Sequence, residues 1–326
     1  MKSFFSSIAD IVLLVLTVFF MIGMIVFMIS MISRFAPAWL LKIFSKTKKL
    51  IPRQPDNLML SDTITPKKMF YNTREAEAVR KLASLLQEEN FRKIQDSLNL
   101  KGMRKGFACL FSGEPGTGKT ETAYQIARET KRNIIMVDIP KIKGCFFGEN
   151  AKNIQDVFEM YKNEFENSAI APILLFNEAD AVVGKRIEYS SASRAVDRDE
   201  NATQNVLLQE MENFSGILIA TTNFTQNMDK AFERRFLYKI NFEKPTMESR
   251  RNIWKTLLPD LPEGLTGELS GRFALSGGQI ENIARKTEVE TIINSGVLSM
   301  NTIVQFCRDE TMNSHNVIGN IGFVNG

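Results

Sequence analysis

The chain has 326 residues, of which 44% are hydrophobic and 24% charged, a composition that fits one or two globular domains. Its three cysteines are widely spaced, which fits free thiols in a reducing compartment and excludes a dense disulfide scaffold. The net charge is +4, but residues 34–53 carry six basic residues and no acidic one, so the remaining chain is slightly acidic. That distribution argues against a nucleic-acid-binding domain. The single histidine, His315, excludes an HExxH zinc-protease motif within this sequence.

The first element along the chain is an uncharged apolar run, Ile11–Ser33. A helix of that length spans about 34 Å, enough to cross a bilayer core of about 30 Å. A cleaved signal peptide would have a shorter apolar region and a small-residue cleavage site, and a buried core helix would have a polar face. The run is longer than a signal peptide's apolar region, has no such cleavage site and has no polar face. We therefore predict an N-terminal transmembrane anchor over residues 1–33. Because the basic cluster follows this run, the positive-inside rule places the remaining chain in the cytoplasm or an equivalent compartment.

Residues 34–74 contain four prolines and show no clear periodicity, and we interpret them as a basic linker. Its lysines either contact anionic lipid headgroups or act only as a topology signal. A helix is predicted over Glu75–Leu98. After it, strands and helices alternate, which predicts an α/β fold with a mostly parallel, five-stranded sheet over residues 75–245. The predicted strands are 107–112, 133–138, 172–177, 216–221 and 236–242.

After Pro245 the pattern changes to helices only. Residues 246–326 are therefore predicted to form a small all-helical domain, with helices over 247–258, 278–294 and 299–312.

A glycine-rich loop joins the first predicted strand to a predicted helix. Glycines let successive backbone N–H groups point at one anion, and the positive end of the following helix adds to that attraction. Lys119 can reach the β- and γ-phosphates, and the Thr120 hydroxyl can hold Mg²⁺. A turn that binds nothing is the alternative, but strand, loop and helix in register favour a nucleoside triphosphate site. The loop residues are Gly113, Glu114, Pro115, Gly116, Thr117, Gly118, Lys119 and Thr120.

Polar residues follow two later strands. Asn177 and Glu178 end one apolar run, and Asn223 comes shortly after the next. The carboxyl ends of parallel strands meet at one edge of a sheet, where the phosphate loop also lies. Further along the chain, Arg234 and Arg235 are adjacent. Each feature alone is weak evidence for a hydrolytic site. Their order along the chain after a phosphate loop argues against coincidence.

Together, residues from about 75 to 326 resemble the AAA family of ATPases, within the AAA+ class. The resemblance implies ATP with Mg²⁺ as the nucleotide, and residues 113–120 and 173–178 as the Walker A and Walker B motifs. It implies that Glu178 polarises the attacking water and that Asn223, as sensor 1, orients it. It also implies a ring of identical subunits, usually a hexamer, in which Arg234 and Arg235 reach the neighbouring site as arginine fingers.

Two further positions bear on this resemblance. The first Walker B position is usually aspartate, and here it is Asn177, a neutral residue that puts metal affinity and rate in doubt more than ATP binding. Asp180 lies beyond the matching position, so it is not the expected replacement. The run Leu275–Ile280 resembles the start of the sensor 2 helix, which places Gly277 at the nucleotide.

The segment Cys145–Glu149 resembles the first pore loop of the family, with Phe146 and Phe147 as residues that grip a polypeptide. The alternative is that both rings pack in the core. Residues 184–201 form either a second pore-facing loop or a surface loop. The leading hypothesis is a membrane-anchored ATPase that remodels or unfolds protein substrates on the ATP-containing side of the membrane. The alternatives are a nucleotide-gated membrane scaffold with weak hydrolysis and, disfavoured by the acidic body, a nucleic-acid motor.

Overall fold

The computed structural model describes Met24 and residues 57–142, 150–184, 195–223, 228–293 and 300–313. The predicted transmembrane run, apart from Met24, lies outside this part of the chain, as do Phe146 and Phe147. Among the described residues, no helix combines the length and the apolar character that a membrane span requires. The chain divides into two units, residues 1–54 and 55–326, and the second is described below.

A six-stranded sheet forms the centre of this unit, in the order β1-β3-β4-β5-β2-β6. Of the strands among the described residues, five are parallel and correspond to the five predicted ones, and only β1 is antiparallel, paired with β3. The sequence prediction missed β1, because two residues cannot show the alternation that marks a strand. The count of five strands was therefore wrong, and part of the predicted linker adds to the edge of the sheet. The bounds are β1 Leu58–Met59, β2 Phe107–Gly113, β3 Ile134–Asp138, β4 Ile173–Asn177, β5 Ile217–Thr222 and β6 Tyr238–Phe242.

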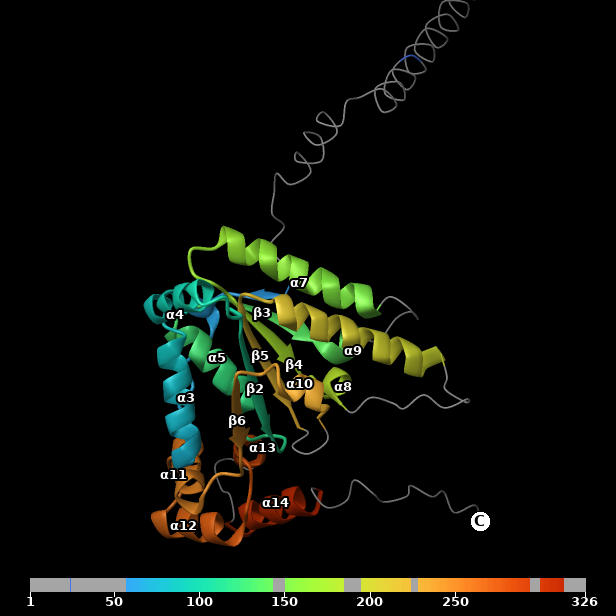
Figure 1. Ribbon diagram of the computed structural model, residues 1–326. Helices are drawn as coiled ribbons and strands as arrows, with labels where there is room; N and C mark the ends of the chain where they lie inside the picture. Colours follow the sequence, from blue (N-terminus) through green and yellow to red (C-terminus); the bar gives the residue numbers. More distant parts are fainter. Residues whose placement is uncertain are drawn as a thin grey trace, which may run out of the picture. The chain divides into compact units, whose positions relative to one another are not determined.

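Helices cover both faces of the sheet (Figure 1). Along β2, Cys109 and Phe111 point into one core cluster, and Ala108 and Leu110 point into the other. This alternation arises because successive strand residues face opposite sides, and both sides are apolar because both are covered. The first cluster lies under α3 Thr73–Leu85, α4 Glu88–Leu100 and α5 Lys119–Glu129, and the second under α7 Asn150–Asn167 and α9 Ala195–Asn213. Short helices α6 Ile139–Ile142, α8 Asp180–Val183 and α10 Lys230–Glu233 and the 3₁₀ turn Ser61–Thr63 complete this part.

The helix predicted over Glu75–Leu98 is in fact two helices, α3 and α4. The chain leaves the helical conformation at Gln87, which has extended backbone angles. Leu86 is fully buried, and its carbonyl accepts a hydrogen bond from Arg132 Nε at 2.9 Å. This tertiary anchor turns the chain at a point where local helix propensity shows no break.

In the part of the chain that the structure describes, four helices follow β6 and have a core cluster of their own around Trp254 and Leu269. Three of them match the predicted helices within two residues. The helix α12 was missed because its ten residues include three glycines, which lower helix propensity. The bounds are α11 Met247–Leu257, α12 Glu263–Arg272, α13 Gly277–Ile293 and α14 Met300–Asn313.

Candidate active site

The glycine-rich loop leaves β2 at Gly113 and enters α5 at Lys119. Gly113, Gly116 and Gly118 all have positive φ angles, of 146°, 75° and 92°. At Gly113 there is also no room for a side chain, because a Cβ would lie 2.1 Å from the carbonyl oxygen of Phe242. The loop therefore depends on glycine for its path, and that path leads to the N-terminus of α5, where free backbone N–H groups attract anions.

The ammonium group of Lys119 is held in place by three oxygen atoms. Its Nζ donates to the carbonyls of Gly113 and Glu114, each at 2.8 Å, and to Oδ1 of Asn223 at 2.9 Å. Burial lowers the pKa of Lys119 to about 8, and the negative charges of Asp180 and Glu114 act in the opposite direction. A phosphate at this position would supply the negative charge that a buried ammonium lacks.

Asn177 lies at the end of β4, at the position where the resemblance to the AAA family leads us to expect an aspartate. Its side-chain oxygen accepts the hydrogen bonds that an aspartate carboxylate would accept there. Its Oδ1 accepts a hydrogen bond from the Thr120 hydroxyl at 2.8 Å and one from the Thr221 hydroxyl at 3.1 Å. The Thr120 proton is thus used within the protein, and the oxygen keeps a lone pair for a cation. Thr120 and Asn177 therefore fit a Mg²⁺ ion that takes its other ligands from phosphate and water, although neither side chain neutralises its charge.

Glu178 is the next residue and has an unusual backbone. Its φ is +54°, in the left-handed region that costs a non-glycine residue about 1 kcal/mol or more. The turn is supported by a hydrogen bond from the Glu178 N–H to the Thr221 hydroxyl at 3.2 Å. The side chain is exposed and lines the same cavity as Lys119 and Asn223. Strain at a cavity-lining carboxylate is typical of a functional position.

Two adjoining cavities share Gly116, Gly118, Thr120 and Glu121. One, of about 280 Å³, contains the residues expected to contact phosphate, and we call it the phosphate cavity. The other, of about 370 Å³, is bounded by the segment 67–70, by α5 and by α11 and α13, and we call it the base cavity. Their sizes fit the triphosphate and the nucleoside parts of one nucleotide.

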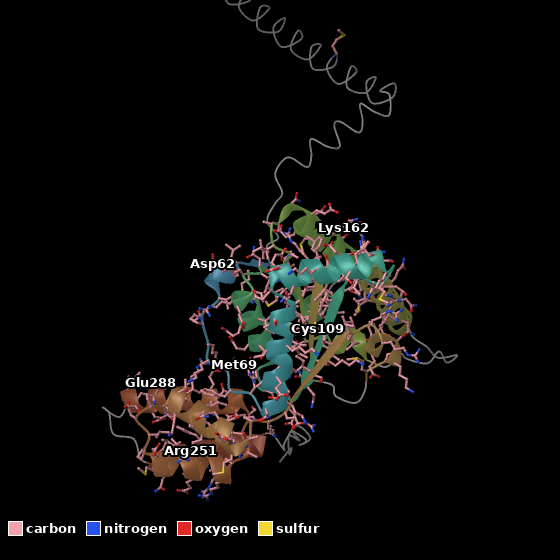
Figure 2. All side chains as sticks on the ribbon, turned by 60° about the vertical axis from the view of Figure 1, so that its left-hand side comes forward. Asp62, Met69, Cys109, Lys162, Arg251 and Glu288 are labelled. Carbon is pink, nitrogen blue, oxygen red and sulfur yellow. The ribbon has the colours of Figure 1, made fainter. Side chains whose placement is uncertain are left out.

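The segment that contains Met69 forms one wall of the base cavity. In Figure 2, Met69 lies between the sheet and the helices that carry Arg251 and Glu288. The Met69 methyl group approaches Gly118 so closely that a Cβ there would be 2.8 Å from it. On the opposite wall, the Gly278 N–H donates to the Gly116 carbonyl at 2.8 Å, and a Cβ on Gly278 would be 3.0 Å from the Gly116 Cα. The C-terminal helices thus contact the phosphate loop directly, next to the predicted Gly277.

Comparison with known proteins identifies this central region. Residues 109–244 match the model of the ATPase family associated with various cellular activities, AAA. They form an AAA ATPase domain. It includes the phosphate loop, Asn177, Glu178, Asn223 and the two arginines.

Curated relatives extend the similarity beyond this domain. The chain is 30% identical over 215 residues to ATP-dependent zinc metalloprotease FtsH 1 of Rhodopirellula baltica, covering 63% of this chain and 31% of the relative. It is 30% identical over 174 residues to 26S proteasome regulatory subunit 6A of Schizosaccharomyces pombe, covering 51% and 36%. It is 27% identical over 266 residues to ATP-dependent zinc metalloprotease YME1L1 of Homo sapiens, covering 78% and 33%. The chain thus spans about a third of the length of these relatives.

The two adjacent arginines of the AAA domain have different surroundings. Arg235 donates to the carbonyls of Leu208 and Ala231 at 3.2 and 2.8 Å and forms an ion pair with Glu212 at 3.3 Å. Arg234 is exposed, and its side chain has no hydrogen bond or ion pair within the described residues. Neither arginine lines the phosphate or the base cavity of its own chain. Of the two, only Arg234 has an exposed guanidinium group without a partner within the described residues.

Sequence reasoning missed several residues of the AAA domain and its surroundings. The base cavity shares Gly116, Gly118 and Thr120 with the predicted loop, but no sequence motif marks its other walls in the segment 67–70 and in α11. Lys67 is an example: its Nζ lies 2.8 and 3.0 Å from the Glu281 carboxylate, across 214 positions of sequence. The phosphate cavity also contains Thr221 and Thr222, which directly precede Asn223 in the sequence and lie with it at the edge of the sheet where polar residues were predicted.

Proposed function

We propose that this chain is an ATP-driven protein remodeller, which binds and hydrolyses ATP with Mg²⁺ in a ring of identical subunits and acts on polypeptides. The observation that carries this proposal is the convergence of Lys119, Glu178 and Asn223 on one cavity. Those three side chains come from the loop after β2 and the ends of β4 and β5. Phosphate binding alone would need only the first of them.

Each side chain has a distinct task in this proposal. Lys119 and the loop N–H groups bind the β- and γ-phosphates, and Thr120 and Asn177 would hold Mg²⁺, which supplies charge neutralisation at the phosphates. The Glu178 carboxylate accepts a proton from the attacking water, and Asn223 orients that water. Both groups line the cavity on the side opposite the base, which is where the terminal phosphate would lie.

A ring would complete this site. Among the described residues, the cavity is lined by one cation, Lys119, and by no arginine. An arginine finger contributes about 10³–10⁵ in rate, so an isolated protomer would be nearly inactive. The exposed Arg234 supports an arrangement in which one protomer provides this group to the next, and a hexamer is the ring size that we propose.

The polypeptide substrate and the membrane anchor rest on other grounds. The relatives' names include a regulatory subunit of the proteasome and two ATP-dependent proteases, and the two protease names describe ATP-dependent action on proteins. This sequence has no HExxH motif, so the similarity supports the ATPase part alone. We propose that Phe146 and Phe147 grip the substrate, and that residues 1–33 anchor the chain with its ATPase domain on the cytoplasmic or an equivalent side.

A second candidate function is a nucleotide-gated membrane scaffold with weak hydrolysis, which Asn177 favours. An amide at this position keeps the hydrogen bonds to Thr120 and Thr221 and gives up a negative charge beside the metal. Such a site would bind ATP and respond to it without rapid turnover.

One experiment separates the two functions. ATP turnover and ATP affinity are measured for the full chain in detergent micelles, for the wild type and for Glu178→Gln. The remodeller predicts a fall in turnover of at least about 100-fold with affinity retained, because only the water-activating group is lost. Equal turnover in both proteins would support the scaffold. A matched control is Glu77→Gln, an exposed residue of α3 away from both cavities.

A further inference from the structure

The carboxylate of Asp180 binds the chain at the end of β5 rather than the nucleotide cavity. Its Oδ1 and Oδ2 lie 2.9 and 3.2 Å from the backbone nitrogen of Asn223, whose N–H donates to them. The Thr222 hydroxyl donates to Oδ1 as well. Thr222 and Asn223 line the phosphate cavity, whereas Asp180 is not among its lining residues. Asp180 therefore lies behind these two residues and uses both oxygens on them.

Asn223 needs this support because it lies just beyond the sheet. The ladder between β2 and β5 ends at the pair Ser112 and Thr222, so no strand pairing fixes the next residue. Asn223 is exposed, yet its Oδ1 accepts a hydrogen bond from Lys119 Nζ at 2.9 Å. Its backbone is held by Asp180 and its side chain by Lys119. The side-chain amide nitrogen has no partner within the described residues and is left as a donor at the cavity.

The charge of Asp180 matches this arrangement. The negative charges of Asp180 and Glu114 oppose the effect of burial on the pKa of Lys119, and Asp180 makes the larger contribution. The carboxylate thus favours the charged form of the lysine that holds the Asn223 side chain. A neutral residue at position 180 would weaken both contacts of Asn223 together.

We propose that Asp180 is a positioning residue, which fixes Asn223 so that its side-chain amide meets the terminal phosphate and the attacking water. This inference rests on the proposed hydrolysis and adds a residue to it. It also gives Asp180 a task other than metal binding. A carboxylate that accepts hydrogen bonds on both oxygens, outside the cavity lining, does not replace the charge that Asn177 lacks.

The test is a double-mutant cycle on the full chain, with Asp180→Ala, Asn223→Ala and the double variant. If Asp180 acts through Asn223, each single variant lowers kcat by about 30- to 100-fold, and the double variant loses no more than Asn223→Ala alone. ATP affinity changes by less than about threefold. Asp180→Asn keeps an oxygen that can accept from the Asn223 N–H, so it recovers part of kcat. The control is Asp96→Ala, an exposed aspartate on α4.

Three outcomes would overturn the proposal. Losses that multiply in the double variant would mean that Asp180 acts independently of Asn223. A raised Mg²⁺ requirement in Asp180→Ala, with none in Asn223→Ala, would mean that Asp180 serves the metal. The third readout does not depend on turnover: amide hydrogen exchange at Asn223 is slow in the wild type and accelerates at least about tenfold in Asp180→Ala. Unchanged amide exchange at Asn223 in Asp180→Ala refutes the positioning role, whether or not the wild type hydrolyses ATP. A wild type that hydrolyses no ATP refutes only the proposed function.

Discussion

The phosphate cavity and the base cavity adjoin each other but are built on different principles. The phosphate cavity consists of backbone N–H groups, one buried cation and polar strand ends, held by hydrogen bonds of 2.8 to 3.2 Å. The base cavity is formed by close packing between the segment 67–70, α5 and the C-terminal helices. Changes in charge should therefore affect the first region, and changes in volume should affect the second.

The largest effect is predicted for pH, through Lys119 in the phosphate cavity. Since the free protein has a Lys119 pKa of about 8, the lysine loses its proton above that pH and no longer attracts phosphate. ATP affinity should be constant below about pH 8 and fall by about tenfold per unit above it, until the pKa of the bound state is reached. Affinity is measured with a fluorescent ATP analogue across this range.

The lowered pKa of Lys119 makes the stability of the fold rise with pH, whereas it makes ATP affinity fall. The folded state binds fewer protons than the unfolded state between the folded and unfolded pKa values of Lys119, so this group makes stability rise with pH in that window. A parallel loss of affinity and of thermal stability above about pH 8 would therefore indicate general unfolding and contradict the assignment.

The next largest effect is predicted for Asn177→Asp, which adds a carboxylate to the phosphate cavity. The new charge lies beside the Thr120 hydroxyl, which now donates to Asn177 at 2.8 Å. The Mg²⁺ concentration for half-maximal ATP binding should fall by about tenfold, because the metal gains a negative neighbour. Asn163→Asp, on the exposed side of α7, is the matched control and should leave it unchanged. If Asn177→Asp needs the same Mg²⁺ concentration as the wild type, the side chain at position 177 does not interact with the metal.

A smaller effect is predicted where the C-terminal helices meet the phosphate loop. In Gly278→Ala the new Cβ would be 3.0 Å from Gly116 Cα, so the two backbones must separate by a few tenths of an ångström. ATP affinity should fall by about fivefold, with little change in its pH profile. Gly264→Ala makes the same chemical change on α12, where a Cβ meets nothing within 4 Å. If both variants bind ATP with the same affinity, the contact between the phosphate loop and α13 does not contribute to ATP binding.

The smallest effect is predicted for the ion pair Lys67–Glu281 at the edge of the base cavity. Both side chains are about 40% exposed, at 41% and 44%, so the pair contributes at most about 1 kcal/mol. Lys67→Glu and Glu281→Lys should each speed ATP release by about two- to fivefold, and the double exchange should restore the slow rate. Stopped-flow release of a fluorescent nucleotide measures this. A double exchange that remains fast would show that the charges act separately.

The contrast between the cavities also explains what the sequence could predict. Lys119, Asn177, Glu178 and Asn223 lie at strand ends or in a glycine-rich loop, and parallel strands bring such positions to one edge. The structure places all four at the phosphate cavity, as that rule implies. Apart from the glycine-rich loop and Gly277, the walls of the base cavity carry no comparable signal. Their residues are separated by up to 214 positions and meet only through tertiary packing, as Lys67 and Glu281 do.

Besides α12, one strand and one helix break escaped prediction for physical reasons. The strand β1 is too short for a pattern, and its pairing with β3 is decided by the partner strand. The break between α3 and α4 depends on the buried Arg132, whose guanidinium group also donates to the Ala171 carbonyl at 2.6 Å. Asp180 was considered as a metal ligand, and only the position of the Asn223 N–H indicates its other task.

Mixing two inactive proteins tests the central claim, a site shared between protomers, most directly. Arg234→Ala lacks the proposed finger, and Glu178→Gln lacks the water-activating carboxylate, so neither should hydrolyse ATP alone. In a mixed ring, a Glu178 site of one variant can receive Arg234 from the other, and about a quarter of the sites should regain turnover at equal mixing. Recovery of ATP turnover to about that fraction of the wild-type rate is the predicted result. No recovery, in protein shown to form mixed rings, would contradict the shared site.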